Sequence, residues 1–366
     1  MYSSIPFCSK QKNIRDFYFK VSSISNGMIA SIKKISAFIF VFGFVFIEQA
    51  IGQQKFVFEK PAMGSPFTIS IYAIDSAKAA QAASLGFHCA DSLNEIFSDY
   101  IDSSELNRLN ATSGQNRFVP VSEALFDILK YSIEAARLSD GAYDISMGPV
   151  VKLWRKARKE KRLPDPDSLK AAMQKTGYRF IHLNDKERSV WLEKEGMLLD
   201  LGGLGKGYVA HAALSVIQSR GFKSAMVNAG GKIAIGEAPP GRKGWRIGIT
   251  IPEEKEALLP RLLLLKNTSV ATSGDIYQHL DINGKRYSHI VDPKTGIGMT
   301  RQRNVTVIAK DATISDWLAT ACSVLPEKKS FKLIKKIPGA ALLISELQNG
   351  KLIRKSTPNF ESYFEN

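Results

Sequence analysis

The order of helical and strand patterns along the chain most constrains its fold. Two stretches over 55–74 alternate apolar and polar residues around a Gly/Pro turn, which predicts a β-hairpin. Apolar residues at helical spacing over 76–97 then predict a long helix. Further strands and helices follow, among them strands at 197–200 and 340–345 and a hairpin turn at Asn283-Gly284, without the regular alternation of a doubly wound sheet. The sequence therefore predicts an α+β fold of mixed helices and sheets.

The first fifty residues have a different character from the rest. Two lysines precede a short apolar run over 37–47, and small residues follow at Ala50 and Gly52. A transmembrane helix needs about 20 apolar residues, whereas a basic flank, a short apolar run and a small-residue site are typical of a secretory signal.

We therefore expect residues 1–52 to be a signal peptide, with Met28 as an alternative start, and residues 53–366 to be one exported domain. The expected location is the periplasm. An uncleaved segment that anchors the protein to the inner membrane stays open as an alternative.

The chain is basic, with a net charge of +15, which suits an anionic ligand, a nucleic acid or an anionic membrane surface. Its charge is spread along the sequence, and the dense cluster at 155–162 continues a predicted helix after Trp154. We interpret this cluster as a solvated helix face. Because no nucleic-acid-binding module is present, we expect no nucleic-acid partner.

A glycine-rich turn over 200–207 leads from a predicted strand into a predicted helix. Glycines let backbone groups approach an anion closely, and a helix N-terminus offers free N–H donors. The turn lacks the Lys-Ser/Thr ending of a Walker A motif. It predicts a phosphate-binding loop, and a turn kept for packing is the alternative.

Asp316 and Thr320 lie four residues apart on a helix predicted over 312–325. A carboxylate and a hydroxyl on one helix face can hold a hard cation such as Mg²⁺, which keeps open positions for substrate phosphates. An Asp that faces solvent and complements the helix dipole is the alternative.

His289 lies in a segment over 287–296 that also contains Asp292 and a Pro/Gly turn. A histidine has an ordinary pKa near 6.5, so it is the natural general base at neutral pH. Asp292 is a candidate to orient its ring. Alone, His289 would more often be structural, and its neighbourhood favours a catalytic role.

The order and content of these motifs resemble the ApbE family, flavin transferases that move FMN from FAD onto a Thr or Ser of a partner protein. The resemblance covers about residues 60 to 345. Beyond the motifs above, it rests on Met63-Gly64-Ser65, Phe97 to Tyr100, Ser104 to Asn110, Gly141 to Asp144, Gly148 to Trp154 and Asn228 to Gly231.

The resemblance implies that FAD binds between the parts of the fold with Mg²⁺ at its pyrophosphate. It places the metal ligands at the carbonyl of Gly205 and at Asp316 and Thr320, and the base at His289. The implied flavin and adenine contacts are Met63, Tyr100, Ala142, Tyr143, Asp144, Gly202, Lys206 and Ile290. Ser273 and Asp275 are further candidates to hold ligand or metal. Gly205 stands where many members have Ala, and Trp317 where they have a small residue.

The implied function is Mg²⁺-dependent transfer of FMN from FAD to a Thr or Ser hydroxyl of an exported or membrane redox protein, with release of AMP. The acceptor motif of the family does not occur in this chain, so the acceptor is another protein. Two alternatives stay open. One is hydrolysis of FAD to FMN and AMP, and the other is an exported flavin-binding protein without catalysis.

Overall fold

The computed structural model of the chain describes residues 52–252, 257–276 and 278–365. The unit Gln53–Asn366 is compact. The predicted signal segment falls outside the described residues except for Gly52, so its role stays a prediction. Within the described part of the chain, no helix is long and apolar enough to cross a bilayer.

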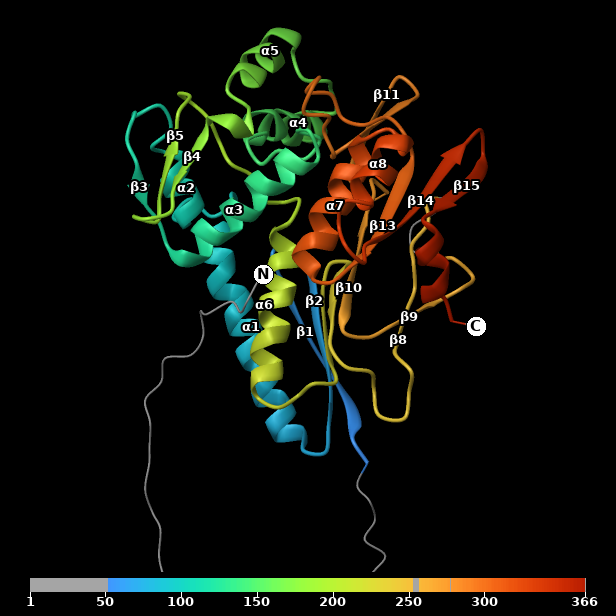
Figure 1. Ribbon diagram of the computed structural model, residues 1–366. Coiled ribbons are helices and arrows are strands. Elements are labelled where there is room, and N and C mark those ends of the chain that lie inside the picture. Colours follow the sequence, from blue (N-terminus) through green and yellow to red (C-terminus); the bar gives the residue numbers. More distant parts are fainter. Residues whose placement is uncertain (1–51, 253–256, 277, 366) are drawn as a thin grey trace, which may run out of the picture. The chain divides into compact units, whose positions relative to one another are not determined.

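An eight-stranded sheet with antiparallel pairing throughout forms the centre of this unit (Figure 1). Its order is β1-β2-β6-β7-β10-β13-β14-β15, so hairpins are combined with longer crossings. The strands are β1 (Gln54–Ala62), β2 (Ser65–Ala73), β6 (Ala225–Ala229), β7 (Lys232–Ile235), β10 (Thr268–Ser273), β13 (Arg303–Ala309), β14 (Ala341–Gln348) and β15 (Lys351–Ser356).

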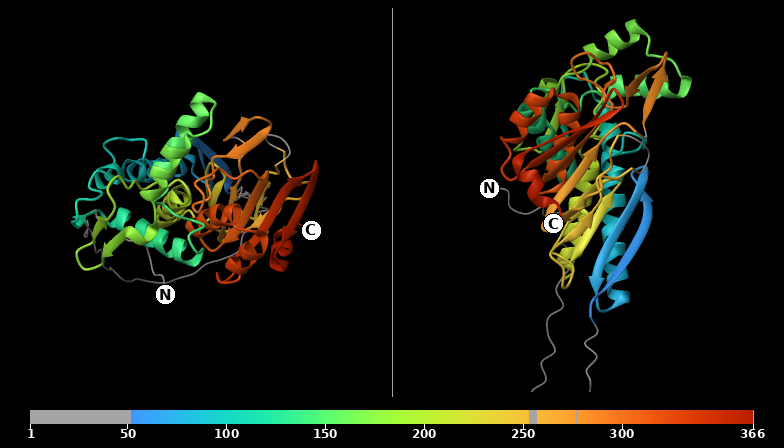
Figure 2. Two further views of the ribbon diagram at one scale, coloured as in Figure 1. Left: turned by 90° about the horizontal axis from the view of Figure 1, so that it is seen from above. Right: turned by 90° about the vertical axis from the view of Figure 1, so that its right-hand side faces the viewer.

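Both faces of the sheet are covered, and the sequence of β13 reflects this. Each of its residues is buried, and Val307 and Ile308 belong to two different hydrophobic clusters. A strand buried on both faces reads as an apolar run instead of an alternation. Helices cover one face, and a hairpin with the C-terminal turn covers the other (Figure 2). These elements are α1 (Ser76–Phe97), α6 (Gly205–Ser219), α7 (Ala312–Val324) and α8 (Glu327–Ile334), then β8 (Trp245–Ile247), β9 (Leu263–Leu265) and η2 (Pro358–Tyr363).

The chain between α1 and α6 builds a smaller region beside the sheet (Figure 1). It contains α2 (Glu105–Asn110), β3 (Val119–Pro120), α3 (Glu123–Leu138), α4 (Gly148–Glu160), α5 (Pro166–Gln174), η1 (Tyr178–Phe180), β4 (Ile181–Asn184) and β5 (Ser189–Leu192). The hairpin of β11 (His279–Ile282) and β12 (Lys285–Ser288) meets this region at α4. There the Trp154 indole N–H donates to the Gly296 carbonyl over 2.8 Å. This bond joins the smaller region to the segment that follows β12.

The α+β prediction is confirmed, and so are the helix over 76–97 and the hairpin turn at Asn283-Gly284. The strand predicted at 197–200 is wrong. The segment forms only an isolated parallel bridge, between Leu198 and Met147. On its other side, the N–H and carbonyl of Leu199 are bonded to the side-chain amide of Asn110, at 2.8 and 3.3 Å, in place of a neighbouring strand. The edge strand β15 was not predicted, because most of its residues are exposed and polar.

Candidate active site

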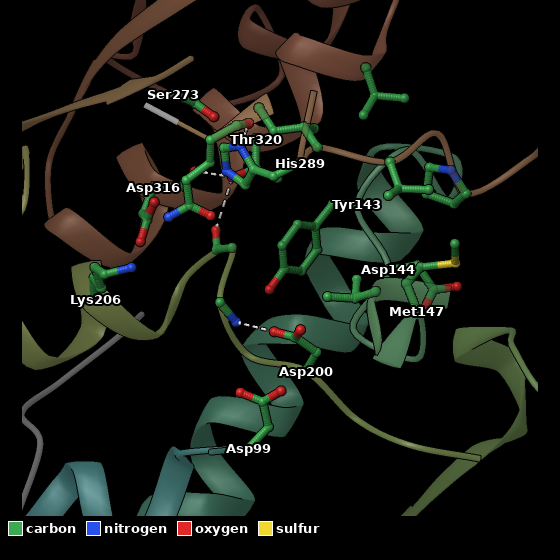
Figure 3. Close-up of a pocket in the computed structure, with 18 of the residues that line it drawn as sticks. Asp99, Tyr143, Asp144, Met147, Asp200, Lys206, Ser273, His289, Asp316 and Thr320 are labelled. Atoms are coloured by element: carbon green, nitrogen blue, oxygen red, sulfur yellow. Dashed lines mark hydrogen bonds between the residues drawn. The ribbon is translucent and has the colours of Figure 1, made fainter. Parts of the chain in front are cut away.

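A pocket of about 260 Å³ lies between the smaller region, the neighbouring ends of the interior strands β7 and β10, and α7 (Figure 3). It brings together most of the predicted site residues: Tyr100, Ala142, Tyr143, Asp144, Gly202, Lys206, Ser273, His289, Ile290, Asp316 and Thr320. Met63, Gly205, Asp275 and Asp292 do not line it. Sites that enclose a drug-sized ligand usually measure about 300–1,000 Å³, so a dinucleotide would extend beyond this pocket.

The glycine-rich turn allows two close approaches that shape the pocket. A Cβ on Gly203 would lie 2.8 Å from the ring of Tyr143. A Cβ on Gly207 would lie 2.1 Å from the carbonyl oxygen of Ala312 and 2.7 Å from Cβ of Asp316. Glycine is therefore required where α6 crosses α7. The start of α6, at Leu204, has no side-chain cap. The N–H of Gly205 donates to the Leu201 carbonyl over 2.8 Å, and the N–H of Gly207 donates to a side chain of α7.

Asp316 lies on α7 and is fully buried. Its Oδ2 accepts the backbone N–H of Gly207 over 3.0 Å, whereas its Oδ1 has no hydrogen-bond partner among the described residues. Burial raises the pKa of this carboxyl, and the Lys232 ammonium 3.8 Å from Oδ1 opposes the rise. An unpartnered carboxylate oxygen in a buried site is a position suited to a cation.

The hydroxyl of Thr320 lies 3.2 Å from the carbonyl oxygens of both Gly203 and Asp316, so it borders the same corner of the pocket. Within the described ranges, no cluster of three or more Asp, Glu, His or Cys side chains could hold a metal. One carboxylate with neutral oxygens nonetheless fits Mg²⁺, which is often bound through one or two carboxylates and substrate phosphates. The assignment of the Gly205 carbonyl as a ligand stays a prediction.

Lys232 is a pocket residue that the sequence analysis missed. It begins β7, its side chain is 15% exposed, and its Nζ donates to the Thr272 carbonyl over 2.7 Å. Burial lowers the pKa of Lys232, and Asp316 opposes that shift. The only signal in the sequence was its place directly after the glycines of the Asn228 to Gly231 motif.

His289 follows β12, and its Nδ1 lies 3.0 Å from the carbonyl oxygen of Gln278 (Figure 3). A carbonyl oxygen can only accept, so Nδ1 carries the proton and Nε2 is left as a base. The pKa of His289 is lowered to about 4, chiefly because burial disfavours the charged ring. The Gln278 carbonyl opposes this shift, while Arg158 and two lysines add to it. The ring is therefore neutral at neutral pH.

Asp292 is not the residue that orients His289. Its Oδ1 accepts the backbone N–H of Lys294 over 2.9 Å, and its carbonyl accepts the N–H of Gly296 over 2.8 Å. The carboxylate therefore stabilises the Pro/Gly turn over 292–296. The Gln278 carbonyl takes the orienting role that was predicted for Asp292, a role that sequence alone cannot assign because every residue has a carbonyl.

At the other end of the pocket, Tyr100 is 74% exposed and the Arg155 guanidinium lies 4.2 Å from its ring centroid. Arg155 also pairs with Asp99 and with Asp200, the latter over 2.8 Å. Asp200 in turn accepts the N–H of Gly202 over 2.7 Å. The cluster at 155–162 is therefore not simply a solvated helix face, because Arg155 and Arg158 line the pocket.

Tyr143 and Asp144 occupy the loop before α4. The Tyr143 ring packs against Trp317, with centroids 6.4 Å apart, so Trp317 supports the pocket wall from behind. Asp144 accepts from the backbone and hydroxyl of Ser146, at 2.8 and 2.6 Å, and from the N–H of Tyr178 at 3.0 Å. Its carboxylate thus holds this loop in shape.

Two further predicted residues, Met63 and Asp275, are not part of the pocket lining. Met63 lies near the start of α6, where a Cβ on Gly205 would be 3.9 Å from its terminal methyl. Asp275 is buried at the base of the β11–β12 hairpin, where burial raises the pKa of its carboxyl and Arg286 opposes the rise.

Comparison with known proteins gives one consistent family. The model of the ApbE family matches residues 63–344. An FAD:protein FMN transferase of Treponema pallidum is 35% identical over 259 residues, covering 66% of this chain and 70% of that protein. The corresponding enzyme of Salmonella typhimurium is 28% identical over 299 residues, covering 80% and 85%.

Solved structures agree with these relatives. The ApbE protein of Thermotoga maritima superposes with a TM-score of 0.76 at 29% identity, covering 86% of this chain and 100% of that one. The flavin transferase ApbE of Vibrio cholerae gives a TM-score of 0.76 at 25% identity, covering 85% and 99%. With the family model matched over most of the sequence and the fold shared with these structures, this chain belongs to the ApbE family.

Proposed function

We propose that this chain transfers FMN from FAD to a Thr or Ser hydroxyl of another protein and releases AMP. One observation carries the proposal: a neutral histidine with an unprotonated Nε2 lines the same pocket as Lys206 and the Oδ1 of Asp316, which has no hydrogen-bond partner among the described residues. That combination supplies a base beside an anion site. The names of the matched relatives, FAD:protein FMN transferase, support the same activity.

In the proposed reaction, the acceptor hydroxyl oxygen attacks the phosphorus of the FMN half of FAD. A new P–O bond forms to the acceptor, and the bond from that phosphorus to the bridging oxygen of AMP breaks. Nε2 of His289 takes the hydroxyl proton, and AMP leaves with the bridging oxygen. Phosphoryl transfer depends mainly on positioning and on neutralising charge, and Lys206 supplies positive charge on the protein side.

Asp316 and Thr320 are the residues that would hold Mg²⁺. When bound, Mg²⁺ would neutralise charge on the pyrophosphate oxygens. Asp316 suits this role because its Oδ1 is buried and without a hydrogen-bond partner among the described residues. The backbone N–H of Gly207 fixes the other carboxylate oxygen, which leaves Oδ1 directed to one position.

The proposed acceptor is an exported or membrane redox protein, because the start of the sequence predicts export to the periplasm. Signal cleavage after Gly52 and retention as an inner-membrane anchor are both compatible with that proposal. In either case the unit Gln53–Asn366 contains the whole sheet and the pocket, so it is the part to assay.

The test is to incubate this unit with FAD, Mg²⁺ and a peptide domain that carries the acceptor motif of the family, and to measure acceptor mass and free AMP. Transfer predicts a mass gain of one FMN unit, an equal amount of AMP, and loss of both on chelation. AMP with free FMN and no adduct would instead indicate hydrolysis, and neither product would indicate a flavin-binding protein.

A further inference from the structure

We propose that Lys232 is a second, protein-supplied cation for the FAD pyrophosphate, which lets this chain bind FAD without a divalent metal. This inference rests on the proposed function for the identity of the ligand. It assigns a role to a residue that none of the sequence motifs singled out.

The position of Lys232 is fixed by the central sheet. It is the first residue of β7 and pairs with Ala271 of the neighbouring strand β10. Its Nζ donates to the carbonyl of Thr272, next along β10, over 2.7 Å. An ammonium group has three N–H donors, so this bond leaves others for a ligand in the pocket that the side chain lines.

The carboxylate of Asp316 neutralises the ammonium charge of Lys232 only in part. Their closest atoms, Nζ and Oδ1, are 3.8 Å apart, which is an ion-pair separation but too long for a hydrogen bond. Oδ1 correspondingly has no hydrogen-bond partner within the described part of the chain. Lysine and carboxylate therefore border one space, in which a phosphate oxygen could accept from Nζ and a cation could bind Oδ1.

The charges around this space favour an anion. The pocket as a whole is lined by four basic and four acidic side chains, but Arg155 already pairs with two of the acidic ones, Asp99 and Asp200. At this end, Lys206 and Lys232 carry two positive charges against the one negative charge of Asp316. Among the described residues, no carboxylate lies within ion-pair distance of Lys206. A pyrophosphate diester carries two negative charges, which this excess offsets in part before any metal binds. Lys232 and a bound Mg²⁺ would then both neutralise negative charge on the same two phosphates.

Two opposite consequences follow when Lys232 is removed. FAD loses a cation, so its binding without metal weakens. Asp316 loses a competing cation, so a metal binds more tightly to the FAD-free protein. Tighter metal binding would show that Lys232 competes with the metal at Asp316, and only the first effect, weaker FAD binding without metal, would show that Lys232 also contacts the ligand. Because coupling is reciprocal, FAD and Mg²⁺ should also help one another more in the variant than in the wild type.

The experiment measures FAD affinity by flavin fluorescence, in EDTA and in saturating Mg²⁺, for the wild type and for Lys232→Met, Lys232→Gln and Lys232→Arg. Lys243→Met is the control, because Lys243 is exposed and lies outside the pocket. Calorimetry on the FAD-free proteins measures Mg²⁺ affinity, and thermal melts check folding.

In EDTA, we expect the Met and Gln variants to bind FAD about tenfold or more weakly, the typical effect of losing one charged hydrogen bond. In Mg²⁺ the loss should shrink to about threefold or less, Lys232→Arg should keep most of the affinity, and FAD-free Mg²⁺ affinity should rise. Equal losses of FAD affinity with and without Mg²⁺, or unchanged Mg²⁺ affinity, would overturn the proposal.

The wild type alone provides a test that does not depend on any variant folding. If it binds FAD only when Mg²⁺ is present, Lys232 does not have this role. The outcome is also separable from the proposed function, because it concerns binding: a protein that binds FAD as described but transfers nothing would refute transfer and keep the role of Lys232.

Discussion

The two ends of the pocket are built differently. At the end proposed to bind the pyrophosphate, here called the phosphate end, Asp316 is fully buried, Lys232 donates to a backbone carbonyl of β10, and Gly207 lets α6 and α7 pack closely. At the aromatic end, Tyr100 is exposed and is held by the cation of Arg155 from a single helix. Several independent packing and hydrogen-bond contacts hold the first end, whereas the second depends on the single ionic cluster around Arg155. Phosphoryl transfer requires fixed distances between the reacting atoms, whereas the binding of an aromatic ring tolerates small shifts. The rigid end therefore suits the proposed reaction, and the less constrained end suits the binding of a ring.

The largest effect should come from removing the base at the phosphate end. His289→Ala should slow FMN transfer by about 10²- to 10⁴-fold, the usual contribution of a general base, with FAD affinity nearly unchanged. Acceptor mass over time and flavin fluorescence measure the two quantities. His182→Ala is the matched control, since His182 pairs with Glu193 away from the pocket. A normal transfer rate in His289→Ala would remove this site from the chemistry.

Adding a methyl group at the start of α6 tests how tightly the phosphate end is packed. Gly207→Ala should destabilise the protein by about 1–3 kcal/mol, because the new Cβ would lie 2.1 Å from the Ala312 carbonyl oxygen. Gly205→Ala, two residues earlier on the same helix, has no neighbour closer than 3.7 Å and should be neutral or slightly stabilising. Denaturant unfolding compares them, and equal stabilities would mean that the helix crossing is loose.

The protonation of His289 gives a prediction about pH. Because burial lowers its pKa to about 4, the neutral base persists well below its ordinary range. The kcat/KM for FAD should be flat from about pH 8 to about pH 5 and fall about tenfold per unit below pH 4. A fall in kcat/KM already near pH 6.5 would instead show that the His289 ring is solvated in the FAD-free protein and that its pKa is not lowered.

The smallest effect is expected at the aromatic end. Arg155→Met should raise the KM for FAD by about three- to tenfold, through loss of the contact with Tyr100 and of the link to Asp200, with kcat little changed. Lys156→Met, on the exposed side of the same helix, is the control. A fall in kcat as large as the rise in KM would mean that the two ends are coupled, against the contrast drawn above.

The sequence predicted the elements whose signals are local. The long helix over 76–97 and the Asn283-Gly284 hairpin turn follow from spacing and turn chemistry, and the motifs identified His289 and Asp316. It could not predict what depends on tertiary placement. The side chain of Asn110 replaces a strand partner at Leu199, two arginines of a charged helix turn toward the pocket, and Lys232 becomes a pocket residue through β-sheet pairing.

One carbonyl has a consequence for how this protein can change over time. The Gln278 oxygen accepts both the backbone N–H and the Nδ1–H of His289, each over 3.0 Å. No substitution at position 278 can delete a carbonyl, and only a change in the path of the chain can move it. The tautomer of His289 is therefore insensitive to the identity of the side chain at position 278, which can vary without removing the hydrogen bond that fixes it.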